Sequence, residues 1–241
     1  MATSWSRVYD AAVLDPLAEQ LVDLAGITTG MRVVDVLAGS GRLTRRLVGG
    51  VGPLGGVTAV EDIDGAGELR DELRAARVAA DVVDAPVTTL PFADSSFEAA
   101  LSLLGVTATR GGVGALEEMA RVARRVIILA PRRGVMEDAV LAALTAGFDD
   151  APAQLLARWE PPPLPVGWTA QVVTDVARFD SATQLLRAVL EHAGLPPPQD
   201  ATHAVHAQLT SALAAFAGAD GTLRVPVQAT VMRSYGVGDE R

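Results

Sequence analysis

The first half of the chain alternates between two hydrophobic patterns. Short runs of Val, Ile, Leu and Ala bounded by glycine or polar residues predict buried strands at 31–36, 57–60, 81–83, 97–104 and 125–130. Between them, apolar residues that recur every third or fourth position predict helices at 15–25, 42–48, 68–77 and 114–124. Strands that alternate with helices through short connections favour right-handed crossovers and a mostly parallel sheet.

Several residues predict where these helices begin and end. Asp15 can cap the first helix, and Gly26 ends it. We expect the pair Gly49–Gly50 to end the second helix. In the last of the four helices, Glu117 and Arg121 have the i,i+4 spacing of an ion pair.

A stiff proline-rich stretch at 161–165 leads into the C-terminal third. The pattern there predicts a strand at 169–176, helices at 181–192 and 203–216, and a last strand at 222–232. The first of these helices can be capped by Asp180 or Ser181. The last strand alternates strictly, and Pro226 within it predicts a local bulge because proline cannot donate a ladder hydrogen bond. No linker divides the chain, which predicts a single domain over 1–241.

The composition excludes several classes of function. The net charge of −9 argues against nucleic acid as a partner, since such binding depends on neutralising phosphates. The chain has no cysteine and no lysine, which excludes a disulfide frame, a thiol nucleophile, a Walker A loop and Schiff-base chemistry. Apolar runs are far shorter than the ~20 residues that cross a bilayer, and the N-terminus lacks signal-peptide features. A cytoplasmic location is expected.

The segment Asp35-Val36-Leu37-Ala38-Gly39-Ser40-Gly41 joins a predicted strand to a predicted helix with the glycine spacing of a nucleotide-binding loop. A dinucleotide loop has a third glycine where this chain has Thr44, so that pattern is incomplete. Asp35 would repel a pyrophosphate but can contact an ammonium group. Glu61 follows Gly41 by 20 residues, the spacing of a carboxylate that accepts hydrogen bonds from ribose. Together these features favour an aminoacyl nucleoside over the alternative of an ordinary turn and a solvated loop.

Four segments in this order resemble the class I S-adenosylmethionine-dependent methyltransferases, in particular the group typified by ubiquinone and menaquinone biosynthesis enzymes. They are Met31–Gly41, Gly52–Glu61, Leu90–Glu98 and Glu118–Val122. The resemblance implies a Rossmann-like α/β fold, with a mostly parallel seven-stranded sheet, helices on both faces and an antiparallel last strand. It also implies S-adenosylmethionine as cofactor and an acceptor pocket and lid formed by 1–26 and about 134–218.

The resemblance further implies a role for each matching position. Those facing the methionine part of the cofactor would be Asp35, Leu37, Ala38, Gly39, Ser40 and Gly41. Glu61 would lie at the ribose, and Leu103 would lie near the sulfonium. The residues at the adenine would be Asp62, Asp84 and Ala85. Tyr9 resembles an aromatic residue that covers the cofactor.

The chain departs from the family pattern at three places. Leu37 stands where the family usually has glycine or alanine, so its bulk can crowd the methionine part. The pair Asp84–Ala85 lies two residues farther from Leu90 than is usual. The usual Pro-Gly-Gly turn before the fifth strand is missing, which indicates a shortened loop.

Candidate catalytic and substrate residues are few. Methyl transfer is an in-line displacement that positioning alone can accelerate, and a base is needed only for an acceptor that loses a proton. His192 is the candidate base, or alternatively a charge that favours the end of its helix. His203 and His206 share a helix face without a third ligand at metal spacing, so no metal site is expected. Trp5 and Tyr9 can line an apolar substrate pocket or anchor the core.

Three hypotheses for function remain. The first is methylation of an oxygen or carbon on a small apolar metabolite in specialised metabolism, since the C-terminal third is rich in Ala, Leu, Pro and Trp. The second is a cyclase or pericyclase of the same fold that transfers no methyl group, and the third is a non-catalytic partner subunit. No motif for methylation of a nucleobase amine follows the fourth strand. The acceptor and the oligomeric state stay open.

Overall fold

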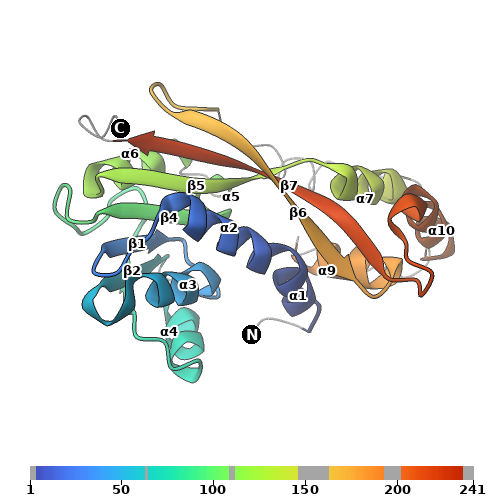
Figure 1. Ribbon diagram of the computed structural model, residues 1–241, viewed down its shortest axis with the longest axis horizontal. Coiled ribbons are helices and arrows are strands. Elements are labelled where there is room, and N and C mark those ends of the chain that lie inside the picture. The colour runs from blue at the N-terminus through green and yellow to red at the C-terminus, as the bar shows by residue number, and fades with distance from the viewer. Residues whose placement is uncertain (1–3, 63–64, 109–111, 146–162, 193–201, 236–241) are drawn as a thin grey trace. The chain divides into compact units, whose positions relative to one another are not determined.

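A computed structural model describes residues 4–62, 65–108, 112–145, 163–192 and 202–235 (Figure 1). It has the Rossmann-like architecture predicted from the sequence: a seven-stranded sheet in the order β3-β2-β1-β4-β5-β7-β6, parallel except for the last strand of the chain. The chain divides into two compact units. The glycine-loop unit comprises 17–130, 161–172 and 230–241, and the second unit comprises 1–16, 131–160 and 173–229. The expectation of one domain with a lid at 1–26 and about 134–218 stays a prediction.

The glycine-loop unit is built on five parallel strands. They are β1 (Arg32–Val36), β2 (Gly56–Glu61), β3 (Asp81–Asp84), β4 (Ala99–Leu103) and β5 (Arg125–Arg132). In the register of the sheet, Asp35 lies opposite Ala59 on one side and Leu101 on the other. The chain runs outward from β1 to β3 and then returns to place β4 on the other flank of β1. This reversal lies between β1 and β4, and open α/β sheets bind ligands outside the carboxyl ends of the strands at such a reversal.

Helices cover both faces of these strands. They are α2 (Asp15–Ala25), α3 (Arg42–Val51), the short η2 (Gly52–Leu54), α4 (Ala66–Ala75), α5 (Gly105–Ala108) and α6 (Gly112–Val122). Val34 of β1 and Met119 of α6 share one buried cluster. Ala59 of β2 packs instead with Leu69 and Leu73 of α4. The alternation of side chains along each strand therefore supplies a core on either face.

The prediction that Gly49–Gly50 ends the second helix is wrong, because α3 continues to Val51. A Cβ at Gly50 would lie 3.2 Å from Cγ2 of Ile27, so this glycine serves close packing inside the helix. The cap of the helix is Gly52, which has a φ of 61° and donates its N–H to the Val48 carbonyl.

The expected ion pair between Glu117 and Arg121 is also wrong, because Arg121 uses its five donors elsewhere. Nε and Nη2 bond to Glu118 at 2.7 Å each, and Nη1 bonds to Asp94 at 2.8 Å. The two remaining donors reach the carbonyls of Phe92 and Leu90 at 2.8 and 2.9 Å. The third and fourth segments of the methyltransferase resemblance are thus joined in one hydrogen-bonded network.

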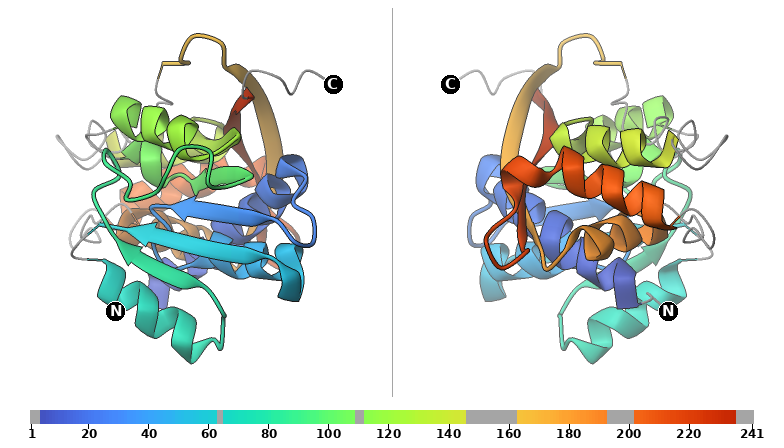
Figure 2. Two further views of the ribbon diagram at one scale, coloured as in Figure 1. Left: turned by 90° about the vertical axis from the view of Figure 1, so that its left-hand side faces the viewer. Right: turned by 90° about the vertical axis from the view of Figure 1, so that its right-hand side faces the viewer.

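The second unit contains most of the remaining elements. They are α1 (Ser4–Tyr9), the π-helix η1 (Asp10–Leu14), α7 (Val135–Thr145), α9 (Ala182–His192), α10 (Thr202–Ala212), η3 (Ala214–Phe216), and much of β6 (Thr169–Phe179) and β7 (Leu223–Tyr235). Helix α10 packs against α7 and α9 (Figure 2). The Ser181 hydroxyl accepts the Gln184 N–H at 3.1 Å, which confirms Ser181 as the cap of α9. Within the described ranges, no helix is long and apolar enough to cross a membrane.

Candidate functional site

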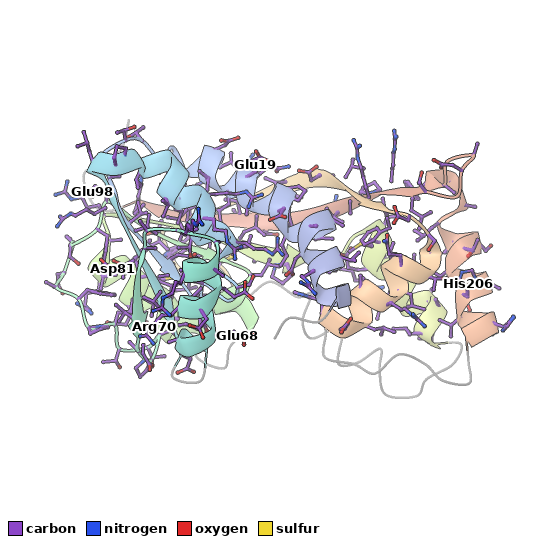
Figure 3. All side chains as sticks on the ribbon, turned by 90° about the horizontal axis from the view of Figure 1, so that it is seen from below. Glu19, Glu68, Arg70, Asp81, Glu98 and His206 are labelled. Carbon is purple, nitrogen blue, oxygen red and sulfur yellow. The ribbon has the colours of Figure 1, made fainter. Side chains whose placement is uncertain are left out.

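The structure brings the cofactor residues predicted in the glycine-loop unit to one edge of the sheet. They lie at the carboxyl ends of four parallel strands: Leu37–Gly41 follow β1, Asp62 follows β2, Ala85 follows β3, and Leu103 is the last residue of β4. At the other edge, the Arg32 N–H donates to Glu98 at 2.6 Å, and Figure 3 labels Glu98 there. The predicted positions therefore gather at the carboxyl ends of the strands around the reversal.

The loop after β1 has a backbone that glycine favours at three positions. Leu37, Gly39 and Gly41 have φ values of 58°, 54° and 72°. A Cβ at Gly41 would lie 2.6 Å from Cδ2 of Leu73, so the loop passes close to α4. A Cβ at Gly39 would meet nothing within 4 Å, so this glycine faces open space. One glycine thus allows close packing beneath the loop while the other leaves room above it.

Glu61 joins the loops that follow β1 and β2. Its Oε2 accepts the Gly39 N–H at 2.6 Å, and its Oε1 accepts the Asp62 N–H at 3.3 Å. A Cβ at Gly65 would lie 2.6 Å from Cγ of Glu61, so the carboxylate keeps this position only because residue 65 has no side chain. Sequence reasoning missed Gly65, whose only local signal is a glycine shortly after an acidic strand end.

Asp35 is fully buried at the end of β1. Its Oδ2 accepts a hydrogen bond from the Thr44 hydroxyl at 2.6 Å, whereas its Oδ1 is buried without a partner. Burial raises the pKa of Asp35 to about 7, the Thr44 hydrogen bond opposes this, and the Glu61 charge adds to it. Thr44, which breaks the dinucleotide pattern, therefore positions the carboxylate. Sequence reasoning had taken it only as a missing glycine.

Leu37 packs against the hydrophobic cluster beneath α5 and α6. Its Cβ lies 2.6 Å from the point where a Cβ on Gly105 would be. The side chain is half-buried, and part of its bulk lies against apolar residues of the glycine-loop unit.

The other predicted positions differ in exposure. Asp62 and Asp84 are exposed, Ser40 and Leu103 are half-buried, and Ala85 is buried. The Ala85 N–H donates to the Glu61 carbonyl at 3.2 Å, which ties the end of β3 to the end of β2. Asp84 thus presents an exposed carboxylate at the carboxyl end of β3.

Two candidates from distant parts of the sequence meet in the second unit. The rings of Tyr9 and His192 are stacked, with centroids 4.1 Å apart and planes 19° from parallel. Burial raises the pKa of Tyr9, and the carboxylates of Glu137 and Asp10 raise it further. Burial also raises the pKa of Glu137 to about 7, while the Gly134 N–H, which donates to it at 3.0 Å, opposes the rise. Sequence reasoning missed Glu137, which looks like an ordinary acidic residue in a first helical turn.

Other predicted residues of the second unit carry less information. The side chain of Trp5 lies outside the described part of the structure. His203 and His206 lie on α10, and His206 is labelled in Figure 3. Of the residues described, no three His, Cys, Asp or Glu side chains form a group that could hold a metal ion.

The residues at the edge of the glycine-loop unit fit an aminoacyl nucleoside. The unpartnered Oδ1 of Asp35 lacks a donor such as an ammonium group, and the space beside Gly39 is free of protein atoms. The Glu61 carboxylate provides the acceptor that ribose hydroxyls need. This set of donors and acceptors suits a cationic ligand better than a pyrophosphate.

Comparison with known proteins agrees with this chemistry. The family described as "Methyltransferase domain" matches residues 34–128. This segment is therefore similar to methyltransferase domains. This similarity implies S-adenosylmethionine as the cofactor.

Similar proteins extend the likeness beyond this segment. The ubiquinone/menaquinone biosynthesis C-methyltransferase UbiE of Ectopseudomonas mendocina is 35% identical over 104 residues, which are 42% of this chain and 41% of that protein. The chain thus spans about two fifths of the length of this relative. The YcgJ protein of Bacillus subtilis shares the fold with a TM-score of 0.54 and 15% identity, over 91% of this chain and 97% of its own. The [4+2]-cyclase SpnF shares it with a TM-score of 0.51 and 15% identity, over 93% and 82%.

Proposed function

We propose that the chain is an S-adenosylmethionine-dependent methyltransferase that acts on an oxygen or carbon of a small apolar metabolite. The observation that carries this proposal is the buried Asp35 carboxylate, whose Oδ1 lacks a partner, on the strand that leads directly into the glycine loop. A buried acceptor without a donor has a free-energy penalty that a ligand with an ammonium group would remove.

The residues of the glycine-loop unit would divide the cofactor between them. Asp35 would hold the ammonium group, and the backbone of Gly39–Gly41 would cradle the methionine part. Glu61 would hold the ribose, with Asp62, Asp84 and Ala85 at the adenine. When bound, the cofactor supplies an electrophilic methyl group. The contribution of the protein is to fix the ligand in line for displacement, because positioning alone removes much of the barrier.

The acceptor is proposed from the composition of the C-terminal third, which is rich in apolar residues. An apolar pocket with few polar groups suits a small metabolite. If the acceptor is a hydroxyl, it loses a proton during transfer, and His192 is the candidate proton acceptor. We also propose that the protein acts in the cytoplasm, without nucleic acid.

Binding of the cofactor is the first test. Isothermal titration calorimetry with S-adenosylmethionine and S-adenosylhomocysteine should show one site for each. A matched pair of variants lies on β3, where Asp84 stands at the carboxyl end of the strand and Asp81 at its amino end. Asp84→Asn should weaken binding about tenfold by removal of a charged hydrogen-bond acceptor, whereas Asp81→Asn should leave it unchanged.

The outcomes separate the three hypotheses. Release of S-adenosylhomocysteine with one of a panel of phenolic and aliphatic acceptors supports the methyltransferase. Tight binding without release of that product across the panel overturns methyl transfer and favours a cyclase that retains the cofactor. Binding of neither ligand refutes the proposal and favours a non-catalytic subunit.

A further inference from the structure

The loops that follow β1 and β4 face each other across the strand reversal of the glycine-loop unit. Leu37 is the first residue after β1, and Leu104 is the first after β4. Both have a left-handed backbone, with φ values of 58° and 63°. This conformation is strained for a bulky residue and persists only where the surroundings enforce it. Two strained leucines on facing loops indicate that these loops are held in a required shape.

Gly105, which follows Leu104, is the point of closest approach between the loops. A Cβ at Gly105 would lie 2.6 Å from Cβ of Leu37 and 2.7 Å from its carbonyl oxygen. Gly105 is not among the positive-φ glycines, so its backbone does not demand glycine. The requirement for glycine here comes from the space that Leu37 occupies.

Further contacts fix both loops around this pair. The Leu104 N–H donates to the Leu129 carbonyl at 2.9 Å, and the Val106 N–H donates to the Ser102 hydroxyl at 3.2 Å. Val106 is fully buried in the cluster against which Leu37 packs. The loop after β4 therefore cannot retreat easily to make room for a side chain at residue 105.

We propose that Leu37 and Gly105 act as one steric unit that sets the conformation of the cofactor loop, and that Gly105 is a positioning residue for the amino-acid end of the cofactor. The missing side chain at Gly105 makes room for the leucine at the head of the loop. A side chain there would push the backbone of Leu37 toward Ala38 and Gly39, the part of the loop that faces the ligand. This inference rests on the function proposed above.

The test compares two ligands that differ in their amino-acid part. S-adenosylmethionine has it, whereas 5′-deoxy-5′-methylthioadenosine lacks it. Gly105→Ala should weaken the binding of S-adenosylmethionine about tenfold or more, because small shifts at a positioned site have large effects. The affinity for the thioadenosine should change less than about threefold. Gly49→Ala is the matched control, because a Cβ there meets nothing within 4 Å.

A second substitution in the same molecule separates positioning from general damage. Leu37→Gly removes the Cβ that clashes with the new alanine, so the double variant should regain about threefold or more of the lost affinity. The recovery should be partial, because the carbonyl of residue 37 still lies 2.7 Å from the new Cβ. Equal weakening of both ligands by Gly105→Ala, or no recovery in the double variant, overturns the inference. Failure of the unaltered protein to bind S-adenosylmethionine refutes the proposed function instead.

Discussion

Asp35→Asn should stabilise the ligand-free protein while it weakens cofactor binding. The substitution keeps the shape of the side chain and an oxygen for the Thr44 hydroxyl, and it removes the charge. In the folded protein the pKa of Asp35 is raised to about 7 from a usual value of 3.8, because the carboxyl is buried. Between these two pH values the unfolded chain has lost its proton while the folded protein still holds it. The stability of the unaltered protein therefore falls as the pH rises from about 4 to about 7.

The size of the effect follows from the width of this window. The pKa of Asp35 is about three units higher in the folded protein than in the unfolded chain. Because each unit corresponds to about 1.36 kcal/mol, the unaltered protein has lost about 4 kcal/mol of stability by pH 8. The asparagine variant has no such loss. Its advantage over the unaltered protein should grow by about 3 kcal/mol from pH 5 to pH 8, since about two units of the window lie above pH 5.

Urea unfolding followed by tryptophan fluorescence at several pH values measures this difference directly. Other buried acids titrate in both proteins and cancel from the comparison. Thr44→Val is a useful companion, because loss of the hydroxyl should move the titration of Asp35 to higher pH. An advantage for Asp35→Asn that is the same at pH 5 and pH 8 would refute the reasoning. On the same variant, calorimetry should show weaker binding of S-adenosylmethionine by about tenfold or more, in keeping with loss of a charge-assisted hydrogen bond.

Three further predictions concern single contacts. The stability advantage of Glu137→Gln over the unaltered protein should be up to about 3 kcal/mol larger at pH 8 than at pH 5 in urea unfolding, because the pKa of this carboxyl is also raised to about 7. An advantage that does not change with pH would contradict this. Gly41→Ala should destabilise the protein by about 1–3 kcal/mol, because the new Cβ would overlap Leu73, whereas Gly49→Ala should be neutral or slightly stabilising in the same assay. Arg121→Met should lower the melting temperature by roughly 5 °C in calorimetry, because it removes the hydrogen bonds of the Arg121 guanidinium. The control is Arg124→Met, at an exposed position. An equal shift for both variants would show that the hydrogen bonds of Arg121 are not important for stability.

The fold was largely predictable because its signals are local. β1 is a short β-branched run between glycines, and the helix after it has apolar residues at helical spacing, so periodicity and glycine placement identify both. The glycine loop and Glu61 were predictable for the same reason, since their spacing reflects consecutive elements of one crossover. The end of α3 was not, because Gly50 is chosen by the approach of Ile27 and not by the helix itself.

The supporting residues of the site were not predictable from local sequence. Gly105 requires glycine because of Leu37, and Gly65 requires it because of Glu61. Thr44 completes the environment of Asp35 from the opposite end of the loop. In each case the residue type is required by a neighbour in space. No local sequence pattern indicates this neighbour. The stacking of Tyr9 on His192 could not be predicted for the same reason, since the two rings are far apart in the sequence.

The network around Arg121 has a consequence for the exchange of segments between relatives. Its guanidinium joins two carbonyls of the 90–94 loop to Glu118 on α6, and Glu118 also accepts the Leu90 N–H at 2.8 Å. A lysine has three donors at a single point and cannot replace a planar group that serves five. A chimaera that imports the loop without α6, or α6 without the loop, would separate these partners. The two segments should therefore be transplanted together, as one module of recombination.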